Sequence, residues 1–179
     1  FIFITHNHGD HIGDALDIAK RTGATVYGVV ELVETVLSPA GVSVGMGNIG
    51  GRQATSFGSV KYTPAIHGSG IPGGLACGYL FEIDGKKIYH AGDTALARDM
   101  ELLAKETVDL ALLPIGGVFT MGPEDAVQAV NMIKPKRVVP MHYNTFPAIV
   151  QQPEEFKQMV EYQEDCAVTI LCPGEYLEI

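Results

Sequence analysis

The chain has 179 residues, of which 46% are hydrophobic and 18% are charged, a composition that predicts one soluble globular domain over residues 1–179. Its 21 acidic and 12 basic residues give a formal net charge of −9, which disfavours nucleic acid as a partner. No apolar run is long enough to span a bilayer, and three cysteines without a C-x-x-C pair argue against a disulfide framework. We therefore expect a cytoplasmic protein without a membrane partner.

The first predicted element is a buried strand over residues 1–4, and metal-type side chains begin where it ends. His6 and His8 stand two residues apart, so both imidazoles point to one side of an extended segment. Asp10 and His11 follow in the turn into the next helix and can approach the same point. Three imidazoles and one carboxylate suit a divalent ion of the zinc type better than Mg²⁺ or Ca²⁺, which prefer oxygen ligands. The stretch therefore predicts a metal site.

Helices and strands then alternate, which predicts an α/β layered fold. Apolar residues at helical spacing predict a helix over residues 11–22, and Gly23 is suited to end it in the left-handed conformation. A strand over 24–30 and a short helix over 31–37 follow. Residues 41–56 are rich in glycine and have little periodicity, so we expect a loop; it lacks the glycine patterns of nucleotide-binding loops.

Two further strand ends carry candidate ligands. The predicted strands cover residues 57–64, 77–83 and 86–89, the last two joined by a tight Asp84-Gly85 turn. His67 follows the first of them. A lone loop histidine is ordinarily a polar surface residue, but beside the earlier cluster we interpret it as a ligand. Asp93 follows the third strand and fits equally as a ligand and as the cap of the next helix, so both roles stay open.

The last part of the chain repeats the alternation of helix and strand. The predicted elements are helices over 96–105, 123–133 and 154–162 and strands over 108–114, 137–141, 167–171 and 175–179. His142 stands directly after the 137–141 strand, so a fourth strand end carries a metal-type residue. Thr120, Tyr143 and Asn144 also lie in strand-end loops, where we expect contacts with the substrate.

These residues, taken in order, carry a family resemblance. The H-x-H-x-D-H motif, His67, Gly92-Asp93-Thr94 and His142 resemble the signature of the metallo-β-lactamase superfamily. The segments 113–117, 119–126 and 141–147 are similar to those of bacterial UlaG-like metal-dependent hydrolases, which are relatives of ascorbate-phosphate lactonase. The resemblance implies an αββα sandwich. Because that fold begins with strands before the motif, we expect the chain to lack its N-terminal strands.

The resemblance also implies how the candidate ligands are shared between two ions. One ion would be held by His6, His8 and His67 and the other by Asp10, His11 and His142, with Asp93 as the bridge. Such a pair shares a water, lowers its pKa and orients the bridging hydroxide for attack. Zn²⁺ suits this imidazole-rich set best, with Mn²⁺ or Fe²⁺ as alternatives. His8 departs from the di-iron redox branch, which has Glu there, and Asp93 departs from zinc β-lactamases, which use Cys for the second metal.

We accordingly expect a metal-dependent hydrolase of a small molecule, with the homo-oligomeric state left open. The candidate catalytic residues are Asp10, Asp93 and His90; His90 fits a proton donor and, equally, a structural histidine bonded to backbone. Ester or lactone hydrolysis is favoured because the motif loops are rich in glycine and poor in cations, Arg52 and Lys61 being the nearest before His67. A phosphodiesterase or nuclease, and a metal-binding protein without turnover, are the alternatives.

Overall fold

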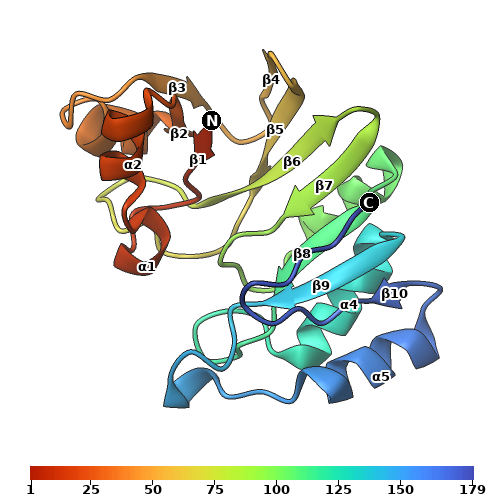
Figure 1. The fold of residues 1–179 in the computed structure, drawn as a ribbon. Helices are drawn as coiled ribbons and strands as arrows, with labels where there is room; N and C mark the ends of the chain where they lie inside the picture. The colour runs from red at the N-terminus through yellow and green to blue at the C-terminus, as the bar shows by residue number, and fades with distance from the viewer.

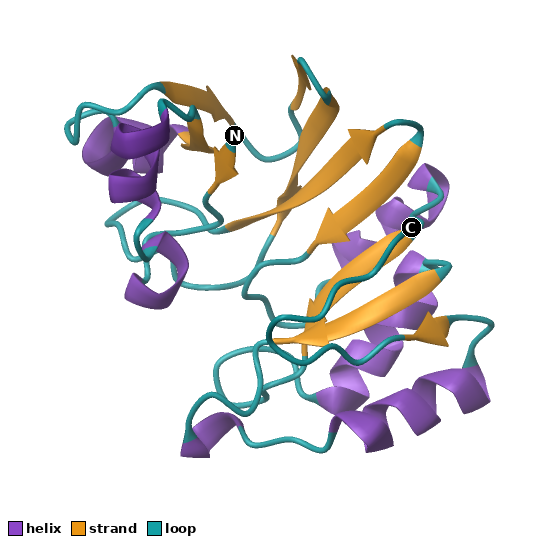
Figure 2. Ribbon diagram, in the orientation of Figure 1, coloured by secondary structure: helices purple, strands orange, loops and turns teal.

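The computed structural model describes residues 1–179 as two β-sheets packed face to face, with helices on their outer faces (Figures 1 and 2). The small sheet has the order β1-β2-β3, and its strands are parallel. Its strands are β1 (Ile2–Phe3), β2 (Val26–Val29) and β3 (Val44–Gly47). The helical segments on this side are α1 (Gly9–Ile12), α2 (Ala15–Thr22), α3 (Val30–Leu32) and the π-helical segment η1 (Val33–Leu37).

The large sheet has seven strands in the order β10-β9-β8-β7-β6-β5-β4. They are β4 (Arg52–Thr55), β5 (Gly58–Pro64), β6 (Cys77–Ile83), β7 (Lys86–His90), β8 (Leu110–Pro114), β9 (Arg137–Met141) and β10 (Ala167–Val168). Strands β5 and β7 are both antiparallel to β6, whereas β8 and β9 continue parallel to β7. The carboxyl ends of β5, β7, β8 and β9 therefore lie at the same edge of the sheet.

Two hydrophobic cores hold these layers together. The outer helical segments of the large sheet are the 3₁₀ helix η2 (Arg98–Glu106), α4 (Pro123–Ile133), the 3₁₀ turn η3 (Pro147–Ile149) and α5 (Pro153–Gln163). One core lies between this sheet and the helices and includes Leu113, Val130 and Phe156. The other lies between the two sheets and includes Val26 and Tyr79. None of the helices is long and apolar enough to cross a membrane.

The prediction of a loop over residues 41–56 is wrong, because this segment contains β3 and β4. A Cβ atom added to Gly45 would lie 2.2 Å from the Tyr27 ring, and one added to Gly47 would lie 2.4 Å from the Tyr62 ring. Glycine at these positions thus lets β3 lie directly against two aromatic side chains. The same glycines remove the alternation of polar and apolar residues by which a strand is recognised in sequence.

Several other predicted elements differ in extent or type. The helix expected over 11–22 is divided into α1 and α2, because Gly13 adopts φ 41° and ψ −132°, outside the helical region. The helix expected over 96–105 is the 3₁₀ helix η2 and begins at Arg98. Of the two expected C-terminal strands only β10 forms, because a turn closed by the Glu175 N–H to the Cys172 carbonyl interrupts the chain there.

Glu106, the last residue of η2, joins this helix to three strands through ion pairs. Its carboxylate oxygens lie 3.0 Å from Arg52 in β4, 2.9 Å from Lys61 in β5 and 3.5 Å from Lys87 in β7. Burial alone would raise the pKa of Glu106, but hydrogen bonds and charges from Lys61 and Arg52 outweigh it and lower the pKa below its ordinary value of 4.5. The folded state therefore favours the charged carboxylate.

We expect Glu106→Gln to lower the free energy of unfolding at neutral pH by about 1 kcal/mol, because one anion serves three cations. The contribution of Glu106 is complete above the ordinary glutamate pKa and disappears as the pH falls through the lower pKa of the folded protein. Urea unfolding at neutral and acidic pH measures this, and the two proteins should converge in acid. Glu101→Gln is the control, since Glu101 pairs only with the exposed Arg98. An equal loss in both variants would contradict the prediction.

Candidate metal centre

The seven expected ligands come from separate segments and meet at one edge of the large sheet. His67, Asp93 and His142 follow the carboxyl ends of β5, β7 and β9. The opposite wall comes from the small-sheet side, where His6 and His8 follow β1 and where α1 carries Asp10 and His11 (Figure 1). The sandwich topology thus brings together residues that are far apart in the chain.

The first group of candidate ligands consists of His6, His8 and His67. His6 Nε2 lies 2.9 Å from His8 Nδ1, and His67 Nε2 lies 3.3 Å from the same His8 atom. On the far side of the His6 ring, the Thr5 hydroxyl lies 3.0 Å from Nδ1 and fixes the orientation of the imidazole. Three ring nitrogens therefore face one another around a common point.

The second group consists of Asp10, His11 and His142, and Asp93 lies between the two groups. Asp93 Oδ2 is 3.2 Å from His11 Nε2 and 3.3 Å from His142 Nε2. The same oxygen is 3.5 Å from His67 Nε2, which belongs to the first group. With only 4% of its surface exposed, Asp93 is enclosed by these imidazoles. One carboxylate oxygen thus contacts ligands of both groups, which is the arrangement required of a bridge.

The chemistry of these atoms fits a divalent-metal centre. Asp93 Oδ1 is buried and has no hydrogen-bond partner within the protein. Buried polar atoms without a partner are costly, and a coordinated cation is one way to satisfy them. Imidazole nitrogens combined with carboxylate oxygens are ligands typical of Zn²⁺ and of first-row transition metals.

The pKa shifts within the cluster also favour metal coordination. The pKa of His6 is lowered to about 3, first by burial and next by the nearby charge of His11. Burial likewise lowers the pKa of His67, so both rings are neutral at physiological pH and offer a free lone pair. Burial alone would lower the pKa of His11 and raise that of Asp93, but the attraction between the two reverses both shifts.

His90 lies outside the cluster. Its Nδ1 accepts a hydrogen bond from the Gly92 N–H at 3.1 Å, and burial lowers the pKa of the ring. His90 does not line the pocket that contains the candidate ligands. This geometry corresponds to the structural alternative, in which the ring supports the turn that carries Asp93. The helix-cap alternative for Asp93 is wrong, because η2 begins only at Arg98.

The candidate ligands open into a pocket of about 390 Å³. It is lined by His8, Asp10, His67, Asp93, Phe119, His142, Thr145 and Phe146. Phe119, Thr145 and Phe146 were missed in the sequence, although they lie in the same strand-end loops as the residues expected to contact substrate. Of those expected residues, none lines this pocket, and the Thr120 hydroxyl instead donates to the Met121 carbonyl at 3.3 Å. The lining contains no lysine or arginine.

Asn144 has a structural role in the loop that follows His142. Its side-chain amide donates to the Gln151 carbonyl at 3.0 Å, and its Oδ1 accepts from the Gln151 N–H at 2.7 Å. The backbone of Asn144 has φ 59°, a left-handed conformation that asparagine tolerates better than most residues. The two hydrogen bonds therefore close the loop and fix the segment next to His142.

We expect Asn144→Ala to lower the free energy of unfolding by about 2 kcal/mol, because it removes both hydrogen bonds and strains the left-handed backbone. Chemical denaturation of the metal-loaded protein measures the loss. Asn144→Asp is the control, since it keeps the Oδ1 acceptor and tolerates the same φ. If Asn144→Ala were as stable as the wild type and altered only kinetic constants, the residue would instead be a substrate contact.

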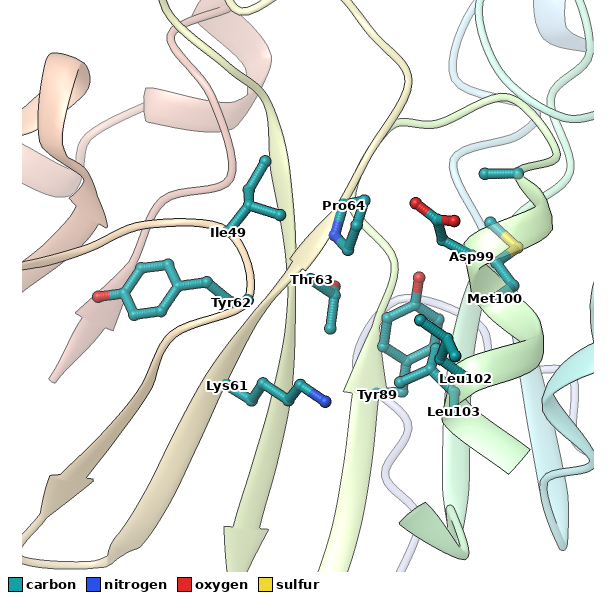
Figure 3. A pocket seen from close by; sticks show the side chains of 12 residues that line it. Ile49, Lys61, Tyr62, Thr63, Pro64, Tyr89, Asp99, Met100, Leu102 and Leu103 are labelled. Carbon is teal, nitrogen blue, oxygen red and sulfur yellow. The ribbon is translucent and has the colours of Figure 1, made fainter. Parts of the chain in front are cut away.

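A second cavity, of about 220 Å³, lies apart from the candidate ligands between β5, β7 and η2 (Figure 3). Its walls are mainly apolar and include Tyr89, Met100 and Leu103. Lys61 also lines it, but the Lys61 ammonium group is paired with Glu106. None of the expected metal ligands lines this cavity.

Comparison with known proteins agrees with this geometry. Residues 1–143 match the family model of the beta-lactamase superfamily domain. A UPF0173 metal-dependent hydrolase of Pelotomaculum thermopropionicum is 49% identical to this chain, over 99% of the chain and 82% of the relative. A protein of the same name from Thermococcus onnurineus is 50% identical, over 99% of the chain and 81% of the relative.

A solved structure with a similar fold supports the same grouping. Igni18, described as a novel metallo hydrolase from the hyperthermophilic archaeon Ignicoccus hospitalis, superposes with a TM-score of 0.90. The two chains are 42% identical, and the match covers 97% of this chain and 76% of Igni18. The αββα sandwich expected from the sequence is therefore confirmed.

Proposed function

Because the chain belongs to the UPF0173 metal-dependent hydrolase family of the metallo-β-lactamase superfamily, we propose that it hydrolyses an ester or lactone of a small molecule with two divalent ions. His6, His8 and His67 would hold one ion, and Asp10, His11 and His142 the other. Asp93, whose Oδ2 contacts imidazoles of both groups, would bridge them. Zn²⁺ suits this ligand set best, and Mn²⁺ or Fe²⁺ are the alternatives.

Bound at these positions, the two ions would lower the pKa of a shared water and polarise the carbonyl oxygen of the substrate. No serine or cysteine nucleophile is needed. The water adds to the carbonyl carbon, the acyl carbon–oxygen bond breaks, and the departing alkoxide takes up a proton. Asp10 lines the pocket with 66% of its side chain exposed, which supports a role in passing protons between the centre and solvent.

The observation that carries the choice of substrate is the absence of lysine and arginine from the pocket lining. Catalysts that bind phosphate esters generally add cationic side chains to their metals. Arg52 and Lys61, the nearest cations in sequence before His67, are instead held by Glu106 on the outer side of the large sheet. An uncharged ester or lactone needs no such partner, so the lining supports acyl chemistry over phosphodiester cleavage.

A panel of lactones assayed beside bis-p-nitrophenyl phosphate tests the proposal. The metal-loaded protein should open at least one lactone, releasing one proton per turnover, with kcat/KM far above that of the Asp93→Ala variant. Faster cleavage of the phosphodiester, with no lactone turned over above that background, would show that the bond assignment is wrong. Metal binding without turnover of either class would indicate a non-catalytic member.

A further inference from the structure

Two exposed aromatic side chains stand at the mouth of the metal pocket. Phe119 and Phe146 line the pocket, and 53% and 43% of their surfaces are exposed. Their ring centroids are 6.0 Å apart, and the ring planes are inclined by 44°. Phe119 lies in the loop after β8 and Phe146 in the loop after β9, so two separate segments bring the rings together beside His142.

The backbone that carries these rings is held in place. The Gly117 N–H donates to the Met121 carbonyl at 2.9 Å, which closes the loop around Phe119. The loop around Phe146 is closed by Asn144, whose N–H donates to the Ile149 carbonyl at 2.9 Å. Gln151 joins the two loops, since its side-chain amide donates to the Gly116 carbonyl at 3.1 Å. The rings are therefore presented by a fixed backbone, as preorganised binding surfaces are.

Apart from Phe119, Thr145 and Phe146, every residue that lines the pocket belongs to the candidate metal cluster. Beyond the candidate ligands, the lining that a bound substrate would meet thus consists of two aromatic rings and one hydroxyl-bearing side chain. Exposed apolar groups that gather at a pocket mouth are characteristic of ligand-binding surfaces. A volume of about 390 Å³ leaves room for a ring beside the reacting group.

We propose that the substrate carries an apolar group about the size of a phenyl ring, attached close to the scissile bond, and that Phe119 and Phe146 bind it. This inference rests on the proposed ester or lactone hydrolysis and adds the class of substituent. The two rings act as a specificity element: they contact the substrate but take no part in bond breaking.

Four matched lactones test the inference: α-phenyl-, α-methyl-, γ-phenyl- and γ-methyl-γ-butyrolactone. Proton release by the metal-loaded protein gives kcat/KM for each. At least one phenyl lactone should exceed its methyl partner by about tenfold, because an apolar pocket discriminates on this scale. In the Phe119→Ala/Phe146→Ala variant the ratio should fall to about one, because the rate on the phenyl lactone falls more than the rate on its methyl partner. Tyr162→Ala, which removes an aromatic ring that is 91% exposed on α5, should leave the ratio unchanged.

A measurement without turnover separates binding from chemistry. The probe is the lactam that corresponds to the preferred phenyl lactone, 3-phenylpyrrolidin-2-one for the α-phenyl and 5-phenylpyrrolidin-2-one for the γ-phenyl compound, because lactams resist hydrolysis. Its binding, measured by calorimetry, should weaken about tenfold in the double variant and not in Tyr162→Ala. Thermal melting should show both variants folded, since all three rings are exposed. If lactones are hydrolysed without any preference for phenyl, or if the preference survives in the double variant, the inference is wrong and the proposed function stands. If the wild type opens no lactone, the proposed function itself fails.

Discussion

Replacing Asp93 with alanine is expected to lower kcat/KM by more than about a thousandfold, because groups that merely support a metal ligand already contribute 10- to 100-fold. Asp93 Oδ2 is within 3.5 Å of three imidazole nitrogens that belong to both ligand groups. Its removal leaves the buried His11 without its anion and the two groups without a shared ligand. The substitution should therefore lower the affinity of both metal positions.

Steady-state kinetics and metal analysis of the same preparations measure this effect. Asp17→Ala is the matched control, since it removes an exposed carboxylate on α2 that is not a candidate ligand and does not line the metal pocket. Asp17→Ala should keep wild-type metal content and activity. If Asp93→Ala retained full metal content and more than about a tenth of the activity, Asp93 would not be a bridging ligand.

Removing the metal is expected to lower the melting temperature by roughly 10 °C. Ions that bind only the folded state stabilise it by several kcal/mol when their concentration is well above the dissociation constant. The ligand geometry exists only in the folded chain, since His67, Asp93 and His142 are brought together by three different strands. Without a cation, Asp93 Oδ1 remains buried without a hydrogen-bond partner.

Thermal unfolding with and without a chelator, followed by addition of Zn²⁺, measures this stabilisation. The Asp93→Ala variant is the internal control, because its melting temperature should respond much less to the chelator. An unchanged melting temperature in wild-type protein that demonstrably loses and regains metal would show that the centre does not contribute to stability.

The candidate ligands could be predicted because they either form one short sequence motif or stand directly after a predicted strand. His6, His8, Asp10 and His11 form one short motif, which specifies metal chemistry before any fold is known. The later candidates each stand after a recognisable apolar strand. The parallel direction of β7, β8 and β9 then determines that these strand ends share an edge. The convergence seen in the structure follows from that topology.

The substrate-facing residues could not be identified in the same way. Phe119 and Phe146 lie in segments that resemble those of the family, but the resemblance assigns them no role, and in sequence an exposed phenylalanine cannot be told from a core residue. Asn144 was expected to contact substrate because it is polar and follows a strand end, yet its side chain is used by the loop itself. Which polar loop residues remain free depends on backbone hydrogen bonds that form only in three dimensions.

Local backbone geometry explains why some helices and strands were predicted wrongly from the sequence. Strand β3 was missed because Gly45 and Gly47 make room for aromatic rings from other strands, a contact that sequence periodicity does not record. The break between α1 and α2 arises from the conformation of Gly13, whereas the apolar spacing continues across it. Both features depend on tertiary packing or on a single φ/ψ choice, and neither changes the pattern of apolar residues.

Metal content measured on three matched proteins tests the two-ion centre most directly. Wild-type protein, reconstituted with Zn²⁺ and freed of loosely bound ions, should contain about two equivalents. His67→Ala removes a ligand of the first group and His142→Ala one of the second, so each should retain about one equivalent. The assignment of these residues to two positions would be contradicted by two findings together: the wild-type protein contains one equivalent or less, and only one of the two substitutions lowers that content.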